Sequence, residues 1–358
     1  MLGVTFKDPL WWSLQMLRVS GFAPFTTKRG FQVSTILTVY GWLLNLTISV
    51  RILFFSTVPR HSLYLASYGS KVCLIMIILS TTFQAGFRLN ALRRCLSTLQ
   101  EIHLKVGQSN IDKRDIRSRL LLLFVWFTLV TSIYLKFSTV YKIGVFQNAI
   151  YLVELCLAHF ISLELHCVLQ NFYSRLVEIY KYIMTELKTE NNVNDDALEM
   201  TPECKVRLIS VSYLKIADTF RLIDKMYSTV MPSIVCLTVF EMINNTKIIS
   251  SVSSVDDAFF ISLIIIGTVW SNFFNFNIFH KINMKVNQII KDLNEIEYYV
   301  QDERLISELE LFKKIVALNS LKFSPLGLFT ITREFVIQIF SCAFTILVIL
   351  YTLDDDDS

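Results

Sequence analysis

The sequence predicts an all-α membrane protein with seven transmembrane helices, a cytosolic N-terminus and an extracellular C-terminus. Three observations support this fold class: long apolar runs, a low share of charge, and an uneven placement of Lys and Arg. Of the 358 residues, 53% are hydrophobic and only 18% are charged, and the mean hydropathy is +0.49. Soluble domains carry about 25% charged residues, so this composition is typical of a membrane protein.

Each apolar run is long enough for one membrane crossing, which needs about 20 residues. The remaining parts are a cytosolic leader (1–30), cytosolic helical extensions with a flexible loop (170–226), cytosolic helices (280–324) and an acidic outer tail (354–358). No secretory signal peptide is visible, so we expect the first span to act as the insertion signal. The expected spans are residues 31–55, 62–87, 120–141, 145–169, 227–249, 258–279 and 335–353, the last within a helix-forming segment at 325–353.

The placement of Lys and Arg predicts the orientation. With the N-terminus inside, the cytosolic segments hold 27 of these residues and the outer loops hold 3. Cytosolic loops of membrane proteins carry such an excess of positive charge. This orientation is the reverse of a G-protein-coupled receptor. A glycosylation sequon begins at Asn244, at the outer end of the fifth span, and fits the same orientation.

Several helices are expected to depart from a simple crossing. The helical patterns of the fourth and sixth spans run on past the membrane, and residues 303–322 form an amphipathic helix that, with the extended helices 4–6, makes a cytosolic anchor domain. Pro232 predicts a kink in the fifth span. Pro325 and Gly327 predict a break before the last helix.

The last span carries a polar stripe. Its members recur at steps of three and four residues, which places them on one helical face; they are Glu334, Gln338, Ser341, Thr345, Val348 and Thr352. Lipid cannot satisfy polar groups, so the stripe must face protein or water. We interpret Gln338, Ser341, Thr345, Val348 and Thr352 as pore-lining, whereas Phe340 lies off the stripe. The alternative is that the small polar groups mediate helix packing.

Ionisable residues within spans need a partner or a role. Arg51, Lys71, Lys136, Glu154 and Glu241 fall in this class. Pairs between a basic residue and Glu154 could hold the helices together. Alternatively Glu154 and Lys71 line a ligand pocket whose apolar walls are Tyr40, Trp42, Tyr134, Tyr151 and Trp270. We expect Glu164, His159 and His166 to be structural rather than metal-binding.

No pattern in the sequence indicates catalysis. A Gly-rich phosphate loop, a nucleophile elbow and a His-Glu-x-x-His zinc motif are all missing. The seven cysteines fall in spans or in cytosolic segments, and none has CxxC spacing. We therefore expect no enzyme activity, cofactor, metal site or structural disulfide, and no nucleic-acid partner.

Two short motifs and the whole-chain architecture resemble insect gustatory receptors. That family ends in Thr-Tyr, five hydrophobic residues and Gln-Phe. Here the last helix has Thr345-Ile346, five hydrophobic residues and Thr352-Leu353, so the Tyr, Gln and Phe are replaced. The leader stretch from Leu17 to Phe25, which contains Gly21 and Pro24, is similar to the Gly-x-x-Pro that the family often carries there.

The resemblance implies a tetrameric, tastant-gated, non-selective cation channel in the plasma membrane of sensory neurons. Four last helices would line one pore, and Thr352 and Leu353 occupy the positions of the outer gate. The acidic residues 354–357 would then form a collar at the outer mouth, although a simple tail is an equal alternative. The implied partners are a small-molecule tastant, permeating cations, membrane lipid and other copies or related subunits.

Alternatives to a gustatory receptor stay open at this point. Insect odorant receptors share the architecture and are the nearest competitor. Among gustatory ligands, a plant bitter compound is favoured over a sugar, because no resemblance to the sugar-sensing branch is visible. From a different class, a secondary transporter is the main rival, but transporters usually show internal repeats.

Overall fold

The computed structural model describes residues 15, 18, 25–26, 32–55, 64–106, 145–188, 201–251 and 255–356. The third expected span at 120–141, most of the leader and the loop at 189–200 lie outside this part of the chain. The described helices are α2 (Thr35–Phe55), α3 (Tyr64–Phe83), α4 (Ala85–Val106), α6 (Val145–Lys188), α7 (Pro202–Tyr227), α8 (Val230–Ser251), α9 (Val255–Tyr299), α10 (Glu303–Leu318) and α11 (Arg333–Asp356).

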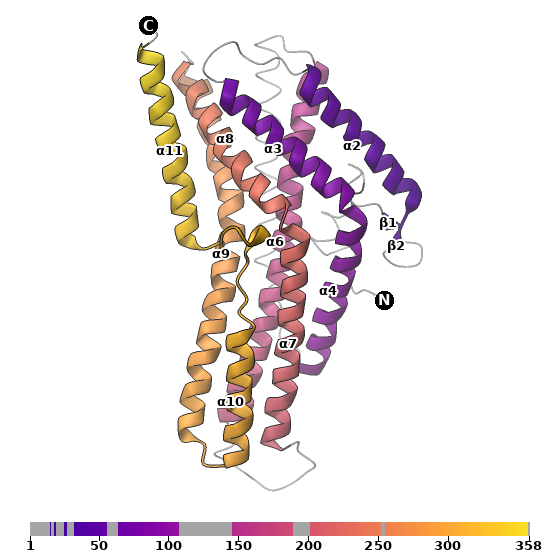
Figure 1. Cartoon of the computed structure of the whole chain (residues 1–358), viewed down its shortest axis with the longest axis vertical. Coiled ribbons are helices and arrows are strands. Elements are labelled where there is room, and N and C mark those ends of the chain that lie inside the picture. Colours follow the sequence, from indigo (N-terminus) through magenta and orange to yellow (C-terminus); the bar gives the residue numbers. More distant parts are fainter. Residues whose placement is uncertain are drawn as a thin grey trace.

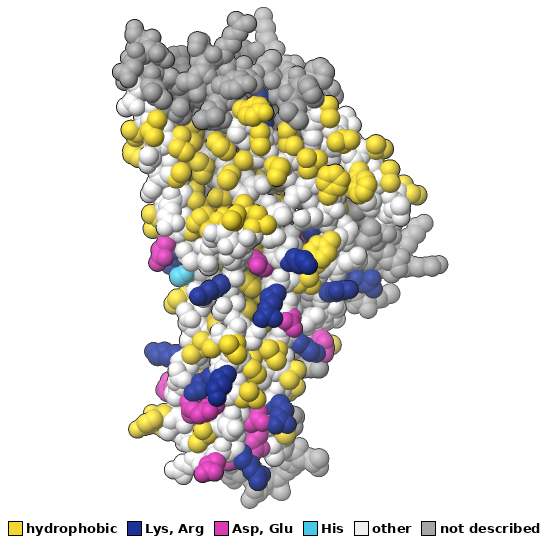
Figure 2. Space-filling view, viewed as in Figure 1, with side chains coloured by type: hydrophobic (Ala, Val, Ile, Leu, Met, Phe, Trp, Pro, Cys, Tyr) yellow, Lys and Arg dark blue, Asp and Glu magenta, His cyan; other side chains and the backbone are white. Residues whose placement is uncertain are grey.

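The helices form an elongated bundle with two halves (Figure 1). Two long helices, α6 and α9, run through both halves. The upper half adds α2, α3, α8 and α11, whereas the lower half adds α4, α7 and α10. Figure 2 shows hydrophobic side chains gathered on the upper half of one face and most charged side chains on its lower half. An apolar upper surface suits lipid, and a charged lower surface suits water.

The long helices α6 and α9 continue past the ends of the expected fourth and sixth spans, as their helical patterns predict. With 44 residues in α6 and 45 in α9, each helix is about 65 Å long at 1.5 Å per residue. The hydrocarbon core of a bilayer is only about 30 Å thick. Roughly half of each helix is therefore left to pack with the lower bundle.

The lower bundle has a continuous apolar core. In α10 the buried residues Leu305, Leu309, Phe312 and Val316 recur at steps of three and four, so one face of this helix packs against α7 and α9. The Asp302 carboxylate caps α10 by accepting a hydrogen bond from the Arg304 N–H at 2.9 Å. The amphipathic helix predicted at 303–322 is thus present, although it ends at Leu318.

Two helix pairs are sharply bent in the middle of the molecule. The axis turns by 66° between α3 and α4, and by 52° between α7 and α8. The second bend lies at Ser228 and Thr229, immediately before Pro232 in the first turn of α8. Proline has no N–H to donate to the carbonyl four residues earlier, and its ring crowds that carbonyl. The predicted kink is therefore confirmed, on the N-terminal side of the proline.

In length and hydropathy, only these two bent pairs of described helices match a membrane span. Within the described residues, no single helix is both long and apolar enough to cross a bilayer alone. Tyr68–Phe83 with Ala85–Ile102, and Pro202–Tyr227 with Val230–Thr246, reach that standard only as pairs, and Thr35–Val50 is apolar but shorter.

The boundaries of the first and last spans differ from the sequence-based expectation. The first span was expected to begin at residue 31, but α2 begins at Thr35, after two short antiparallel strands, β1 (Phe25–Thr26) and β2 (Gln32–Val33). The break before the last helix is confirmed by a 3-10 turn, η2 (Pro325–Gly327), in which Leu326 and Gly327 have positive φ. The last helix then continues into the acidic tail and ends at Asp356.

Candidate functional site

The last helix, α11, stands at the edge of the upper half, where it packs against α8 and α9 (Figure 1). Aromatic rings fix its first turn. The Phe335 ring stacks on the Phe329 ring, with 4.4 Å between ring centroids, and forms a T-shaped pair with the Phe276 ring, with 6.4 Å between centroids. The Arg333 guanidinium donates to the Asn277 side-chain carbonyl of α9 at 3.1 Å. These contacts determine which face of α11 turns inward.

The inward face of α11 is apolar and lies opposite the polar stripe. Phe335, Val336, Ile339 and Ala343 are buried or half-buried, at steps of one, three and four residues. By contrast, all five candidate pore-lining residues are exposed, namely Gln338, Ser341, Thr345, Val348 and Thr352. Within the described part of the chain, the stripe therefore does not serve to pack helices of the same subunit.

The hydroxyl groups of the stripe are oriented by their own helix. Thr345 donates to the Ser341 carbonyl at 2.8 Å, and Thr352 donates to the Ile349 carbonyl at 2.9 Å. A hydroxyl whose proton is used in this way keeps oxygen lone pairs for other partners. The stripe thus presents oxygen acceptors, the ligand type that hard cations prefer.

At the C-terminal end of α11, Thr352 is exposed and Leu353 continues the helix. The side chains of Leu353 and of residues 354–357 lie outside the described set. Their assignment to a gate and to an acidic collar stays a prediction.

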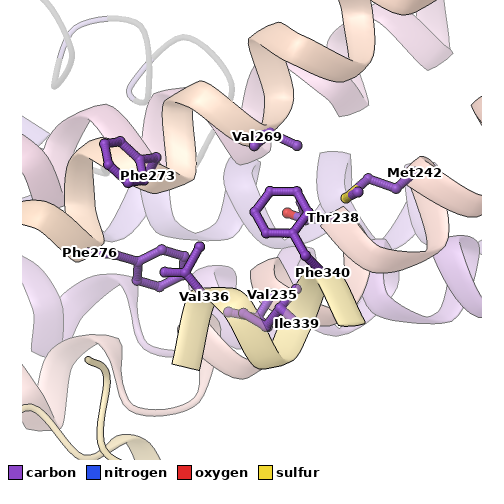
Figure 3. Close-up of a pocket in the computed structure, with 9 residues that line it drawn as sticks. All are labelled: Val235, Thr238, Met242, Val269, Phe273, Phe276, Val336, Ile339 and Phe340. Carbon is purple, nitrogen blue, oxygen red and sulfur yellow. The ribbon is translucent and has the colours of Figure 1, made fainter. Parts of the chain in front are cut away.

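An apolar pocket lies behind α11, on the face away from the stripe (Figure 3). Three helices line it: α8 with Val235, Thr238 and Met242, α9 with Val269, Phe273 and Phe276, and α11 with Val336, Ile339 and Phe340. The sequence placed Phe340 off the stripe but gave no sign that this ring faces a pocket. Periodicity identifies the face of a residue, and it does not identify the helix opposite that face.

Six of the seven predicted ligand-binding residues lie on described helices, and three of them have described side chains. Tyr40 and Trp42 lie on α2 with nearly half of each side chain exposed, and the Trp42 indole N–H donates to the Thr82 carbonyl at 3.3 Å. Lys71 is half-buried on α3. Tyr151 and Glu154 lie on α6 and Trp270 on α9, but their side chains, like all of Tyr134, are outside the described set. Their grouping into one pocket stays a prediction.

A buried ion pair connects α4 with α6. The Arg88 guanidinium donates to the Glu164 carboxylate at 2.5 Å, and both side chains are almost fully buried. The same guanidinium lies over the Tyr227 ring, 5.3 Å from its centre. This agrees with the structural role expected for Glu164. The sequence suggested Glu154 as the acidic partner in such a pair and counted Arg88 among the cytosolic basic residues, so it missed this contact.

The remaining residues that the sequence singled out are either buried, near a helix end, or outside the described set. Glu241 on α8 and His166 on α6 are buried, and Asn244 lies near the upper end of α8. The side chains of Arg51 and His159, and the whole of Lys136, lie outside the described set. No group of three His, Cys, Asp or Glu side chains within the described ranges could hold a metal ion.

Comparisons with known proteins agree on one family and one fold. The family model described as 7tm Chemosensory receptor matches residues 13–354. No curated protein matches the sequence. Two solved structures of the olfactory receptor OR5 from Machilis hrabei are similar. The complex with eugenol has a TM-score of 0.64, is 13% identical and covers 96% of this chain and 97% of that chain. The other has a TM-score of 0.65, is 12% identical and covers 95% and 97%. At such identities, the likeness shows a shared fold.

Proposed function

Because the chain belongs to the 7tm chemosensory receptor family, we propose that it is a gustatory receptor that forms a tastant-gated, non-selective cation channel from four copies. Membership of this family makes it a multi-pass membrane receptor and not an enzyme. The secondary-transporter alternative loses its support for the same reason. The finer assignment rests on the last helix.

The exposed polar stripe of α11 is the observation that carries the channel proposal. Gln338, Ser341, Thr345 and Thr352 would be costly against lipid, where polar groups lack partners. The apolar face on the other side of α11 already packs on α8 and α9, so the stripe is free to face water. One narrow stripe lines only part of a pore, and symmetric copies complete it.

Apolar residues flank the exposed stripe and suit contacts between copies. Ile337 and Phe344 lie along one edge of the stripe, Ile349 lies along the other, and all three are exposed. In a ring of helices, the centre of the exposed face meets the pore and its two edges meet the neighbouring copies. This pattern supports a ring of α11 helices around one axis.

The charge distribution supports an orientation with the lower bundle in the cytosol. The charged lower half (Figure 2) would then form the anchor domain, and the end of α11 would face outward. Thr352 and Leu353 would form the outer gate, and residues 354–357 would supply acidic groups at the mouth. A ring of carboxylates concentrates cations at a pore.

The ligand is proposed to be a small organic tastant, with a plant bitter compound as the leading class. The OR5 complex shows that a receptor of this fold binds eugenol. The proposed pocket lies among the upper helices, with Lys71 and Glu154 as polar groups and Tyr40, Trp42, Tyr134, Tyr151 and Trp270 as walls. An odorant receptor subunit is the second candidate, because the similar structures are olfactory receptors.

Current recordings test the proposal directly. Cells that express only this chain would be exposed in turn to bitter compounds, sugars and volatile odorants. We expect a cation current evoked by at least one bitter compound. A response to volatile compounds alone would favour the odorant receptor, and a current that appears only with a co-expressed relative would replace the homomer with a heteromer. No current in either setting would contradict the channel proposal.

A further inference from the structure

Two free cysteines face each other in the upper half of the molecule, Cys73 on α3 and Cys236 on α8. We propose that they form an oxidation site, at which a peroxide converts the two thiols into a reversible disulfide between the helices. The proposal concerns a bond that an oxidant makes after folding, and not a structural disulfide. The site lies away from the proposed pore face, which belongs to α11.

The contacts between α3 and α8 follow one antiparallel register, and the two helices pack side by side (Figure 1). A Cβ added at Gly69 would lie 2.6 Å from Cζ of the Phe240 ring, and Ser80 donates a hydrogen bond at 2.8 Å to Thr229. Along α3, Ser80 lies 11 residues after Gly69. Along α8, Thr229 lies 11 residues before Phe240. Since 11 residues make about three helical turns, each helix presents one face to the other throughout.

This register places the two thiols opposite each other. Cys73 lies four residues after Gly69, on the same face of α3. Cys236 lies four residues before Phe240, on the same face of α8. The two thiols are accordingly within hydrogen-bonding reach of each other. Small residues such as Gly69 let helix backbones approach closely, as a disulfide requires, because its Cα atoms lie about 4.4–6.8 Å apart.

An oxidant can reach the pair from the side of α8. Cys236 is exposed and Cys73 is half-buried, whereas Cys95 and Cys167 are buried. An accessible cysteine next to a second, resolving cysteine is the arrangement that peroxides oxidise reversibly. Hydrogen peroxide is small and uncharged, so it can reach a sulfur atom at the surface of a membrane-spanning helix.

The oxidation takes two steps and consumes one hydrogen peroxide. The Cys236 sulfur attacks one peroxide oxygen, the O–O bond breaks, and the thiol proton leaves with the other oxygen as water. Cys236 is then a sulfenic acid. The Cys73 sulfur attacks the Cys236 sulfur, the S–O bond breaks, and a second water carries away the Cys73 proton. The two sulfur atoms are oxidised by two electrons in total, and the two peroxide oxygens are reduced to water.

The disulfide would tie α3 to α8 close to the two helix bends. Cys73 lies seven residues before Ser80, and Cys236 lies seven residues after Thr229, which is about 10 Å along each helix. A cross-link between distant parts of the chain restricts the unfolded state, so the oxidised protein should melt at a higher temperature. Because α8 also packs on α11, oxidation would also hold the helix that supports the proposed pore.

Peptide mapping tests the site without relying on conduction. The full chain in phosphatidylcholine vesicles would be treated with hydrogen peroxide, blocked with iodoacetamide and digested with trypsin without a reductant. We expect peptides 72–88 and 226–247 to appear as one cross-linked species that dithiothreitol separates, and a rise in melting temperature that dithiothreitol reverses. Cys236→Ser should abolish both effects. Cys342→Ser is the matched control, because it removes an exposed cysteine of α11 and should leave the cross-link unchanged.

A second variant tests the register itself. Cys73→Ser combined with Val72→Cys moves the thiol by one residue, about 100° around α3, to an exposed position. We expect its cross-link to Cys236 to form about tenfold less, because a disulfide tolerates little misalignment. If Cys236→Ser does not give a monodisperse protein, the cross-linked peptides of the parent still decide, since each contains one cysteine.

Three outcomes would overturn the proposal. The first is an equal yield of cross-link in the register variant and the parent. The second is Cys236 oxidised to sulfinic acid while Cys73 stays alkylated, which would mean that the thiols react singly. The third is cross-linking spread over all exposed cysteines, which would reflect collisions between chains. Because no step needs a current, failure here is distinguishable from failure of the channel proposal.

Discussion

The Ser80 hydroxyl donates a hydrogen bond to the Thr229 hydroxyl oxygen at 2.8 Å, and this contact joins the two helix bends of the structure. Thr229 lies in the break between α7 and α8, and it also donates to the side-chain carbonyl of Gln84, in the break between α3 and α4, at 3.3 Å. Because α8 also packs on α11, the two bends connect α3 with the helix that supports the proposed pore.

Replacing Thr229 tests this connection. Thr229→Val keeps the shape but leaves the Ser80 and Gln84 side chains without this partner, so we expect a loss of about 1 kcal/mol and a melting temperature lower by about 1–3 °C. The measurement is thermal unfolding of the detergent-solubilised protein. Thr47→Val is the matched control, because the Thr47 hydroxyl is exposed and donates to the Leu43 carbonyl of its own helix at 2.7 Å. An equal shift in both variants would remove any special role for the linked bends.

The buried Arg88–Glu164 pair should be far more sensitive than a surface pair. Arg88→Met leaves the Glu164 carboxylate buried without its cation, and the loss of one partner of a buried pair costs about 3–5 kcal/mol. The Arg207–Glu308 pair, with an exposed Arg207, is the comparison, because exposed pairs contribute about 0–1 kcal/mol. Folded yield and melting temperature measure the loss of stability in Arg88→Met and in Arg207→Met. Arg207→Met should therefore behave like the parent, and Arg88→Met combined with Glu164→Leu should recover part of the loss.

Gly69 permits a close approach between α3 and the Phe240 ring of α8. A Cβ added there would lie 2.6 Å from Cζ of the Phe240 ring, whereas a Cβ at Gly86 would meet nothing within 4 Å. We expect Gly69→Ala to destabilise the protein by about 1–3 kcal/mol through overpacking. Gly86→Ala should be neutral or stabilising by up to about 1 kcal/mol, because alanine favours helix. Thermal unfolding measures both, and a partial rescue by Phe240→Leu would assign the effect to the ring.

Periodicity within single segments predicts part of the fold and of the candidate site. The extension of α6 and α9, the break at Pro325–Gly327 and the exposed stripe of α11 all follow from patterns within single segments. The partner of Glu164 could not be found that way, because Arg88 is 76 residues away and follows the second span as one of several basic residues. Burial requires a partner for a charge, but only the packing of the helices selects which one.

The pocket behind α11 and the two linked bends likewise depend on how separate helices pack. Phe340 and Val269 are ordinary apolar residues in apolar segments, and the space between them depends on how three helices meet. Ser80, Gln84 and Thr229 are common polar residues, and nothing in their spacing joins them. Pro232 did predict the kink between α7 and α8, but the opposing bend between α3 and α4 has no proline to mark it.

Asp224 predicts a pH dependence of stability. Burial raises the pKa of the Asp224 carboxyl above its ordinary value of 3.8, and the Ser324 N–H, which donates to it at 3.3 Å, only partly opposes this. A raised pKa means that the folded protein holds the proton more tightly than the unfolded chain, so stability falls as pH rises from about 3.8 through the folded value. Asp224→Asn removes the charge and should raise the melting temperature at pH 7 but not below pH 4. The exposed Asp218→Asn should show no such difference between the two pH values.

The polar stripe makes the most direct prediction about conduction. Gln338→Leu or Thr345→Leu removes polar atoms from the proposed pore face, and we expect single-channel conductance to change by roughly twofold or more, because pore-lining groups set ion passage. Phe340→Leu, although off the stripe, is not a clean control, because its ring lines the pocket behind α11. Ile337→Leu is better matched: Ile337 is exposed on the edge of the same face and stays apolar. Equal changes in conductance from Ile337→Leu and Gln338→Leu would return the stripe to ordinary helix packing between copies.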